Sequence, residues 1–335
     1  MRVLVTGGAG FLGTRLARAL LQRGRLVSTG GEEQPISNLV LADIKPPPAD
    51  LAAHPQVTVV KRDISDPEAL EAACSPDVAS VFHLAALVSG GAEKDFSAGM
   101  DMNFVGMWRL LERCRENGNC PRFVFTSSIA VYGGDLPEVI DDRHHLTPQS
   151  SYGAQKAIGE QLVGDYSRKG YIDGRSVRLP IIAVRPGKAN TAASSWASAI
   201  AREPLAGETY ACPVEPDDIA FILSHRKAIE GLMLAHDSPA GAWGADRSVM
   251  MPGLSCRARD VVAALENVAG KEIADRITWR PDPFIRRIVN TWPARFTLEK
   301  ATRIGFTADE NIEKIISHYI ADELNGVARA AVPQR

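Results

Sequence analysis

The sequence predicts an α/β fold built on a doubly wound parallel sheet, with helices covering both faces. Over about the first 190 residues, short apolar runs alternate with helical stretches. That alternation is typical of parallel strands joined by crossover helices. A glycine-rich turn joins the first apolar run to the first helical stretch. The 335 residues are 45% hydrophobic and 23% charged, which is an ordinary globular balance with ample length for a sizeable core.

The predicted elements follow one another in a regular order along the chain. The apolar runs predict six strands, at residues 2–6, 39–42, 57–60, 80–84, 122–126 and within 174–184. Helical patterns predict long helices at residues 13–24, 102–116 and 152–168. The segment 27–37 is rich in Gly, Ser and Glu, and we predict that it is a loop.

After residue 190 the pattern changes, because Pro and Gly punctuate shorter elements. Helical patterns return at residues 226–236, 258–269 and 311–324. We therefore expect a nucleotide-binding domain at 1–190 that also carries the catalytic residues. A smaller α/β lobe at 191–326 would fold over the carboxyl edge of the sheet and bind substrate. Residues 327–335 would form a tail.

Composition excludes several classes of partner and site. With a formal net charge of −2, the chain lacks the excess of positive charge that is typical of nucleic-acid-binding proteins. The chain begins directly with a strand pattern and contains no run of about 18 apolar residues, so we expect no signal peptide and no membrane partner. Five cysteines without a C-x-x-C pair indicate reduced thiols and a cytoplasmic protein. The pair His144–His145 lacks suitably spaced further ligands, so we expect no metal.

The glycine-rich turn predicts a dinucleotide cofactor. Gly7, Gly10 and Gly13 follow the first strand and open the first helix, with Phe11 and Leu12 between the last two glycines. Glycine adopts the required backbone conformations at little energetic cost, and it keeps side chains away from a pyrophosphate bound at the helix N-terminus. The sheet is therefore predicted to be of the Rossmann type.

Residues at the ends of the next strands predict how that cofactor is held. Asp43 ends the second strand, where a carboxylate can accept both ribose hydroxyls and would repel the 2′-phosphate of NADP. NAD is therefore favoured, although Lys45 is a mild signal against it. Asp63 and Ile64 close the third strand and could flank adenine, while Asp63 could also cap the helix that begins near Pro67. After the fourth strand the backbone should pass close to the cofactor, and small residues there allow this approach. We therefore expect Ala85, Ala86 and the neighbouring Leu84 to contact the cofactor.

A phenol and an ammonium group lie on one face of the helix predicted at 152–168. Tyr152 and Lys156 are four residues apart. A free tyrosine titrates near pH 10, and a neighbouring cation favours the phenolate and so lowers the pKa. A long helix can carry such a pair by chance. Ser128, just after the fifth strand at the edge where ligands bind, favours a catalytic interpretation because its hydroxyl can hold the substrate oxygen.

Together these motifs resemble the extended short-chain dehydrogenase/reductase superfamily. The resemblance rests on the N-terminal T-G-G-A-G-F-L-G, the Asp63–Ile64 pair, the segment 126–133 and the Y-x-x-x-K helix, and it covers roughly residues 1–190. It implies that Ser128 polarises the reacting hydroxyl and that Tyr152 transfers its proton.

The same resemblance implies further roles. Lys156 would lower the pKa of Tyr152 and bind the nicotinamide ribose, Asn103 would lie near the cofactor, and Pro180 would form the turn under the nicotinamide. Dehydratases of this superfamily carry an Asp-Glu pair where this chain has Ile129 and Ala130. Oxidation and 4-epimerisation remain open.

A second resemblance spans nearly the whole chain. The segments 184–198, 202–207 and 211–214, with Leu254 and the stretch 292–294, are similar to the D-erythronate dehydrogenases, which oxidise C2 of a four-carbon aldonate. This similarity implies NAD-dependent oxidation of D-erythronate, or a close aldonate, to the 2-oxo acid in sugar-acid catabolism. The expected partner is a small anionic sugar acid.

The small polar residues after the sixth strand suit such a polyol, and we expect substrate contacts from Asn190, Thr191 and Ser195. A carboxylate is best held by arginine. Arg185, Arg202 and Arg226 are the candidates, and we favour Arg226 for its place at the start of a helix in the second lobe.

Two other functions stay open at this point. One is a sugar-nucleotide 4-epimerase with tightly bound NAD, which would give no net NADH. The other is an NAD-sensing regulatory protein, although such proteins typically lose the tyrosine that this chain keeps. In the superfamily, the helices matching 102–116 and 152–168 commonly form a dimer interface, so the resemblance implies a homodimer.

Overall fold

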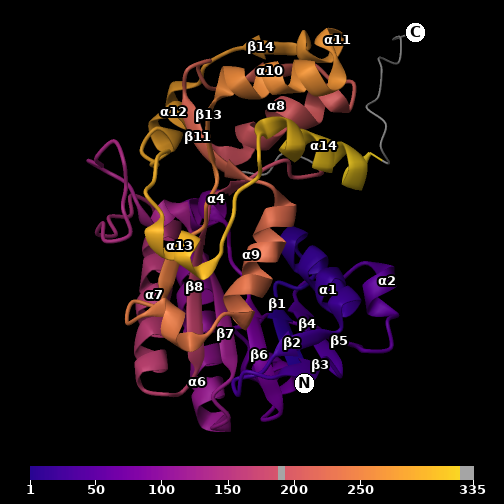
Figure 1. Cartoon of the computed structure of the whole chain (residues 1–335), viewed down its shortest axis with the longest axis vertical. Helices are drawn as coiled ribbons and strands as arrows, with labels where there is room; N and C mark the ends of the chain where they lie inside the picture. The colour runs from indigo at the N-terminus through magenta and orange to yellow at the C-terminus, as the bar shows by residue number, and fades with distance from the viewer. Residues whose placement is uncertain (188–192, 325–335) are drawn as a thin grey trace.

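The computed structural model describes residues 1–187 and 193–324, and its centre is a seven-stranded parallel sheet (Figure 1). The strand order is β12-β8-β7-β6-β1-β4-β5. All six predicted strands are present, and the predicted doubly wound α/β fold is confirmed. The strands are β1 (Arg2–Thr6), β4 (Asn38–Asp43), β5 (Val57–Lys61), β6 (Val78–His83), β7 (Arg122–Ser128), β8 (Asp173–Leu179) and β12 (Ser248–Met250).

Helices cover both faces of this sheet, which explains why consecutive residues of central strands such as β1 and β4 are buried. On one face, α1 (Phe11–Arg23) and α9 (His225–Asp237) share a core cluster with β1. On the other face, α3 (Pro67–Ala73), α6 (Met107–Asn117) and α7 (Ser151–Arg168) share a second cluster. Val3 and Val5 of β1 therefore enter one cluster and Leu4 enters the other, so none of these three can be polar without loss of packing.

A second group of elements packs around its own core at one end of the central sheet (Figure 1). Its helix α10 (Ala258–Ala269) spans the predicted residues, and α14 (Ile312–Glu323) lies within the predicted range. None of the helices in the described ranges is both long and apolar enough to cross a membrane. The other elements of this group are β9 (Ile181–Ile182), α8 (Trp196–Leu205), β10 (Tyr210–Cys212), β11 (Ile219–Leu223), β13 (Leu254–Arg257), α11 (Lys271–Ala274), β14 (Ile277–Trp279) and α12 (Pro283–Val289).

Two local predictions were wrong. The segment predicted as a loop at 27–37 contains β3 (Glu33–Pro35), which pairs antiparallel with β2 (Arg25–Val27). This strand is polar and exposed, so it carries no hydrophobic period. The helix predicted from residue 102 begins instead with a π-helical turn, η1 (Asp101–Gly106). The remaining short elements are α2 (Ala49–Ala52), α4 (Ser89–Lys94), α5 (Phe96–Met100), η2 (Ile129–Val131), η3 (Ala193–Ser195), η4 (Ala240–Trp243) and α13 (Glu299–Ile304).

The larger core is not confined to the first 190 residues. After building part of the second group, the chain returns to the sheet through α9 and then adds β12 beside β8. The added strand covers an edge of β8 that would otherwise present unpaired backbone groups. The tail expected at 327–335 lies outside the described residues.

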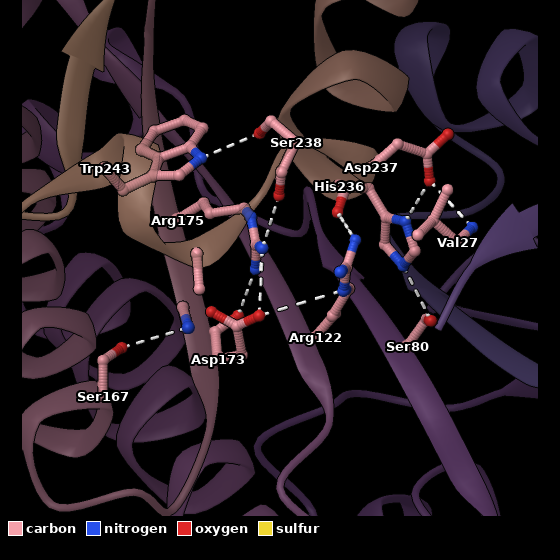
Figure 2. A network of polar contacts seen from close by, with 12 residues as sticks. Val27, Ser80, Arg122, Ser167, Asp173, Arg175, His236, Asp237, Ser238 and Trp243 are labelled. Carbon is pink, nitrogen blue, oxygen red and sulfur yellow. Dashed lines mark hydrogen bonds and ion pairs between the residues drawn. The ribbon is translucent and has the colours of Figure 1, made fainter. Parts of the chain in front are cut away.

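A buried polar network ties this returning segment to the start of the strands (Figure 2). Arg122, at the start of β7, donates to the carbonyl of His236 at the end of α9, and Arg175 donates to the carbonyl of Ser238 at 2.9 Å. Asp173 pairs with Arg175 at 2.9 Å and with Arg247 at 2.7 Å. One carboxylate therefore holds guanidinium groups from both parts of the chain.

Candidate active site

A cavity of about 440 Å³ lies where the central strands end, between the sheet and α8. This is the carboxyl edge, where parallel α/β sheets bind their ligands. Most of the predicted site residues line the cavity, although they come from separate strands and helices. They are Gly7, Gly10, Phe11, Leu12, Gly13, Asp43, Ile64, Leu84, Ala85, Ala86, Ser128, Tyr152, Lys156, Pro180 and Ser195.

The glycine loop forms one wall, and its packing excludes side chains. Gly7 has a φ of +69°, and a Cβ added there would lie 2.7 Å from the nitrogen of Ala85. A Cβ on Gly13 would lie 2.0 Å from the carbonyl oxygen of Gly7. Helix α1 begins beside this loop, so its first N–H groups, which have no partner within the helix, face a space that suits a pyrophosphate. The loop therefore fits a dinucleotide.

Asp43 lies at the other end of this wall with both carboxylate oxygens held in place. One oxygen accepts a hydrogen bond from the backbone of Ala9 at 3.1 Å, and the other accepts from the backbone of Lys45 at 3.0 Å. The position suits the hydroxyls of an adenosine ribose. Arg62 also lines the cavity and pairs with Glu68 at 2.7 Å. Sequence reasoning missed Arg62, although it directly precedes Asp63 at the end of the neighbouring strand.

The structure does not bring Asp63 to the cavity. Its carboxylate accepts hydrogen bonds from the backbone and the hydroxyl of Ser65, both at 2.8 Å. Its alternative role as a helix cap is also wrong, because Asp66 caps α3 by accepting from the backbone of Glu68. The short turn after β5 uses Asp63 to stabilise itself, while the neighbouring Ile64 faces the cavity.

Asn103 likewise lies behind the cavity wall. It sits in the π-helical turn η1 with its side chain buried. Its carbonyl oxygen accepts from the backbone of Leu87 at 2.7 Å, while its amide donates to the carbonyl of Leu87 and to Gln155. Asn103 therefore joins the segment after β6 to helix α7 and does not itself line the cavity, and its place near the cofactor stays a prediction.

Ser128, Tyr152 and Lys156 converge on the cavity from two elements. Ser128 ends β7 and its hydroxyl accepts from the backbone of Ala130 at 3.1 Å. Helix α7 begins at a Ser150 cap, which places Tyr152 in its first turn and Lys156 one turn later. The Lys156 ammonium donates to the carbonyl of Thr126 at 2.7 Å and lies 5.6 Å from the centre of the Tyr152 ring.

Burial controls the ionisation of this group in the ligand-free protein. It raises the pKa of Tyr152 to about 12, against a smaller opposing effect of the hydrogen bond with Ser128. It also lowers the pKa of Lys156 to about 7, although the charge of Glu160 opposes this shift. The predicted lowering of the Tyr152 pKa is therefore not seen in this state, because desolvation outweighs the attraction of a lysine that is itself poorly solvated.

A buried ion pair stands directly behind these residues. Glu160 accepts from the hydroxyl of Ser127 at 2.5 Å and from the guanidinium of Arg178 at 2.6 Å. Arg178 in turn donates to the Tyr132 hydroxyl at 2.6 Å. Sequence reasoning missed this pair, although Glu160 lies four residues after Lys156 and so on the same helical face. The pair holds β7, β8 and α7 in register around the cavity.

The opposite wall is built by elements of the second group. Ser195 lines the cavity as predicted, while Asn190 and Thr191 lie outside the described residues. Arg226 does not reach it. Its guanidinium is paired with Asp322, with Nε donating at 2.9 Å, because α14 packs beside the start of α9. The other two candidate arginines and a tryptophan missed from the sequence line this wall: Arg185, Arg202 and Trp292.

Chemically, the cavity combines a glycine loop that suits an anion, a carboxylate placed to suit a ribose, and a Ser-Tyr-Lys group. A hydroxyl and a phenol can hold and deprotonate an alcohol, and the loop can hold a dinucleotide beside it. Within the described ranges, no three His, Cys, Asp or Glu side chains are grouped so that they could hold a metal ion.

Known proteins resemble this chain over nearly its whole length. D-erythronate dehydrogenase from Cupriavidus necator is 49% identical over 322 residues, covering 96% of this chain and 98% of that protein. D-erythronate dehydrogenase from Haemophilus influenzae is 39% identical, covering 96% and 99%.

A solved structure is also similar. It is described as the nucleoside-diphosphate-sugar epimerase from Agrobacterium tumefaciens, with a TM-score of 0.90 and 38% identity, covering 98% of this chain and 96% of that one. Residues 3–214 match the profile of the NAD dependent epimerase/dehydratase family. The predicted membership is confirmed, and the chain belongs to the NAD dependent epimerase/dehydratase family.

Proposed function

We propose that the protein is an NAD-dependent dehydrogenase that oxidises the C2 hydroxyl of D-erythronate, or a close aldonate, to the 2-oxo acid. The observation that carries the reaction type is the convergence of Ser128, Tyr152 and Lys156 on one cavity with the glycine loop. The substrate is inferred from the two relatives named D-erythronate dehydrogenase, which match this chain almost end to end. The reaction would be a step in the catabolism of sugar acids.

In the proposed mechanism, each residue of the group has one task. The hydroxyl of Ser128 holds the C2 oxygen, and Tyr152 takes the hydroxyl proton as the C=O bond forms. Lys156 in its protonated form favours the phenolate of Tyr152 and would also hold the nicotinamide ribose. NAD, when bound, supplies the acceptor for the hydride that leaves C2.

The cofactor preference is proposed from the carboxylate of Asp43. A carboxylate held at this position accepts ribose hydroxyls and repels a 2′-phosphate, so NAD is preferred to NADP. The nearby Arg62 acts in the opposite direction, but its guanidinium is already paired with Glu68. Pro180 would lie under the nicotinamide, at the end of β8.

We also propose a homodimer formed through α6 and α7, in the cytoplasm. These helices and the short helix α5 carry large apolar side chains on the surface. Trp108 is 44% exposed, Ile158 38% and Phe96 62%. A partner subunit would remove this surface from water.

The test is NADH formation by the purified protein with NAD and a panel of aldonates, uronates and L-threonine, with NADP as the cofactor control. We expect reduction of NAD with D-erythronate or a close aldonate, and much weaker reduction of NADP. If no acid in the panel gives NADH and the protein releases bound NAD on denaturation, a 4-epimerase would be favoured. Binding of NAD without turnover on acids or sugar nucleotides would favour a sensing protein.

A further inference from the structure

Four cationic side chains line the cavity in the described part of the chain, and three of them are already engaged. Arg62 pairs with Glu68 at 2.7 Å, and Lys156 donates to a backbone carbonyl. Arg202 forms two hydrogen bonds to its neighbour Glu203, at 2.6 and 2.7 Å. The fourth is Arg185, and among the described residues no carboxylate pairs with its guanidinium. Among the cationic side chains that the structure describes at the cavity, Arg185 is therefore the one that remains available to an anion.

The backbone of Arg185 is fixed from both sides by helix α8. Its N–H donates to the hydroxyl of Ser198 at 3.0 Å, and its carbonyl accepts from Arg202 at 2.9 Å. Ser198 and Arg202 are both buried. The side chain of Arg185 thus projects from an anchored point on the wall that also presents Ser194 and Ser195.

The electrostatic surroundings of this guanidinium favour an anion. Partial burial, and next the positive charge of Arg202, lower the pKa of Arg185, which nevertheless stays charged because arginine titrates far above neutral pH. A bound carboxylate would relieve both the desolvation and the repulsion. Helix α8 begins beside the cavity, and the partial positive charge at its N-terminus acts in the same direction.

We infer that Arg185 binds the substrate carboxylate through its guanidinium, and this inference rests on the proposed function. A planar guanidinium can donate two parallel N–H groups to the two oxygens of a carboxylate. Arg185 would then set the preference for acids over neutral polyols. The C2 hydroxyl lies next to the carboxylate in an aldonate, so the same contact orients C2 towards Ser128 and Tyr152.

A cofactor diphosphate carries the same kind of charge and is the competing source. The ring of Phe11, in the glycine loop, lies 5.8 Å from the guanidinium carbon of Arg185. The start of α1 already offers N–H groups to a diphosphate. The backbone of Arg185 is held by α8, next to Ser194 and Ser195, although its guanidinium reaches towards Phe11. The substrate carboxylate is therefore the assignment that we favour.

The experiment compares Arg185→Met and Arg185→Lys with Arg259→Met. The control arginine is half exposed in the second group of elements and pairs with Asp217 at 2.9 Å. For each protein we would measure the KM for D-erythronate, the KM for D-erythronamide, which is neutral, and the Kd for NADH. We expect Arg185→Met to raise the KM for the acid by about 100-fold, as loss of a charge-assisted pair implies. The KM for the amide and the Kd for NADH should change by less than about two-fold.

In the lysine variant a point charge replaces the planar fork, so part of the affinity for the acid should return. An equal rise in KM for acid and amide would overturn the inference, and so would a parallel rise in the Kd for NADH. If the wild-type protein forms no NADH with any aldonate, the proposed function would instead be wrong. Calorimetry of D-erythronate binding to the NADH complexes would then test the inference about Arg185 separately. Binding to the wild-type complex that is lost in Arg185→Met would support the inference, and absence of binding to the wild-type complex would overturn it.

Discussion

The burial of Lys156 lowers the free energy of unfolding of the protein near neutral pH. Burial lowers its pKa from 10.5 to about 7, so between these pH values the unfolded chain binds more protons than the folded protein. Folding is therefore penalised below about pH 7, and the penalty is relieved as the pH rises towards 10.5. Such a penalty is expected of a residue retained for catalysis rather than for packing.

We predict that Lys156→Met abolishes turnover and changes the pH dependence of stability. The free energy of unfolding of the variant relative to wild type should be highest near pH 7. It should fall by up to about 1.4 kcal/mol per pH unit above it. Urea unfolding of the ligand-free proteins at pH 7, 8 and 9 measures this. Lys169→Met, at the exposed end of α7, is the matched control and should show no such slope. A slope of zero in Lys156→Met would refute a buried lysine with a lowered pKa.

The predicted residues that do line the cavity are those whose sequence signal is local. Gly7, Gly10 and Gly13 are separated by two residues each, and Tyr152 and Lys156 are one turn apart. Asn103 and Arg226 do not line the cavity, because their side chains are held by partners that are distant in the chain. The partner of Arg226 is Asp322, and Asn103 contacts Leu87 and Gln155. When two side chains in contact are far apart in the sequence, the spacing of nearby residues does not predict that contact.

Among the elements, the segment from α9 to β12 depends on buried charges. Asp173 pairs directly with Arg175 and lies 3.8 Å from Arg122 (Figure 2). It also pairs with Arg247 at 2.7 Å. Removing one partner from a buried ionic network leaves the others uncompensated. The network lies at the start of β7 and β8, whereas the cavity lies at their ends, so stability and activity can be separated here.

We predict that Asp173→Asn lowers the free energy of unfolding by about 3 kcal/mol and leaves the KM for substrate unchanged. Chemical denaturation and steady-state kinetics at a temperature where the variant is folded would measure both quantities. Asp165→Asn removes the exposed partner of Arg168 and should change neither. Equal stability of the Asp173→Asn and Asp165→Asn proteins would show that the network does not stabilise the fold.

The elements that could be predicted are those with a clear apolar run or a clear helical period. All the main strands and helix α10 belong to this group. The hairpin of β2 and β3 is short and polar, and β12 has only three residues. Strand β12 becomes a strand because β8 offers it an edge, and the information for that pairing lies about 70 residues away in the chain.

At the scale of the whole molecule, the two parts of the chain interlock. The cluster beneath α1 contains Leu16 and Leu20 together with Leu232 and Trp243, which come from the second half of the sequence. A division of the chain at residue 190 therefore cuts through one core. The cavity lies between the two parts, so its opposite walls come from different regions of the sequence.

The proposed dimer makes a prediction at this scale. Trp108→Glu places a charge on the apolar surface of α6 and should convert a dimer into a monomer without unfolding it. Sedimentation velocity would measure the mass, and circular dichroism would verify the fold. Trp279→Glu, at a similarly exposed position on β14, is the control and should remain dimeric. A wild-type protein that sediments as a monomer at micromolar concentration would contradict the proposal.

The central claim is hydride transfer from C2 of an aldonate, and the most direct measurement follows that hydrogen. D-erythronate carrying deuterium at C2 would be incubated with NAD and the wild-type protein, with Tyr152→Phe as the inactive control. The account predicts that deuterium appears on the reduced nicotinamide in amounts equal to the 2-oxo acid formed, and that the Tyr152→Phe protein forms almost none. Deuterium that stays on the sugar acid, with no NADH accumulating, would contradict it.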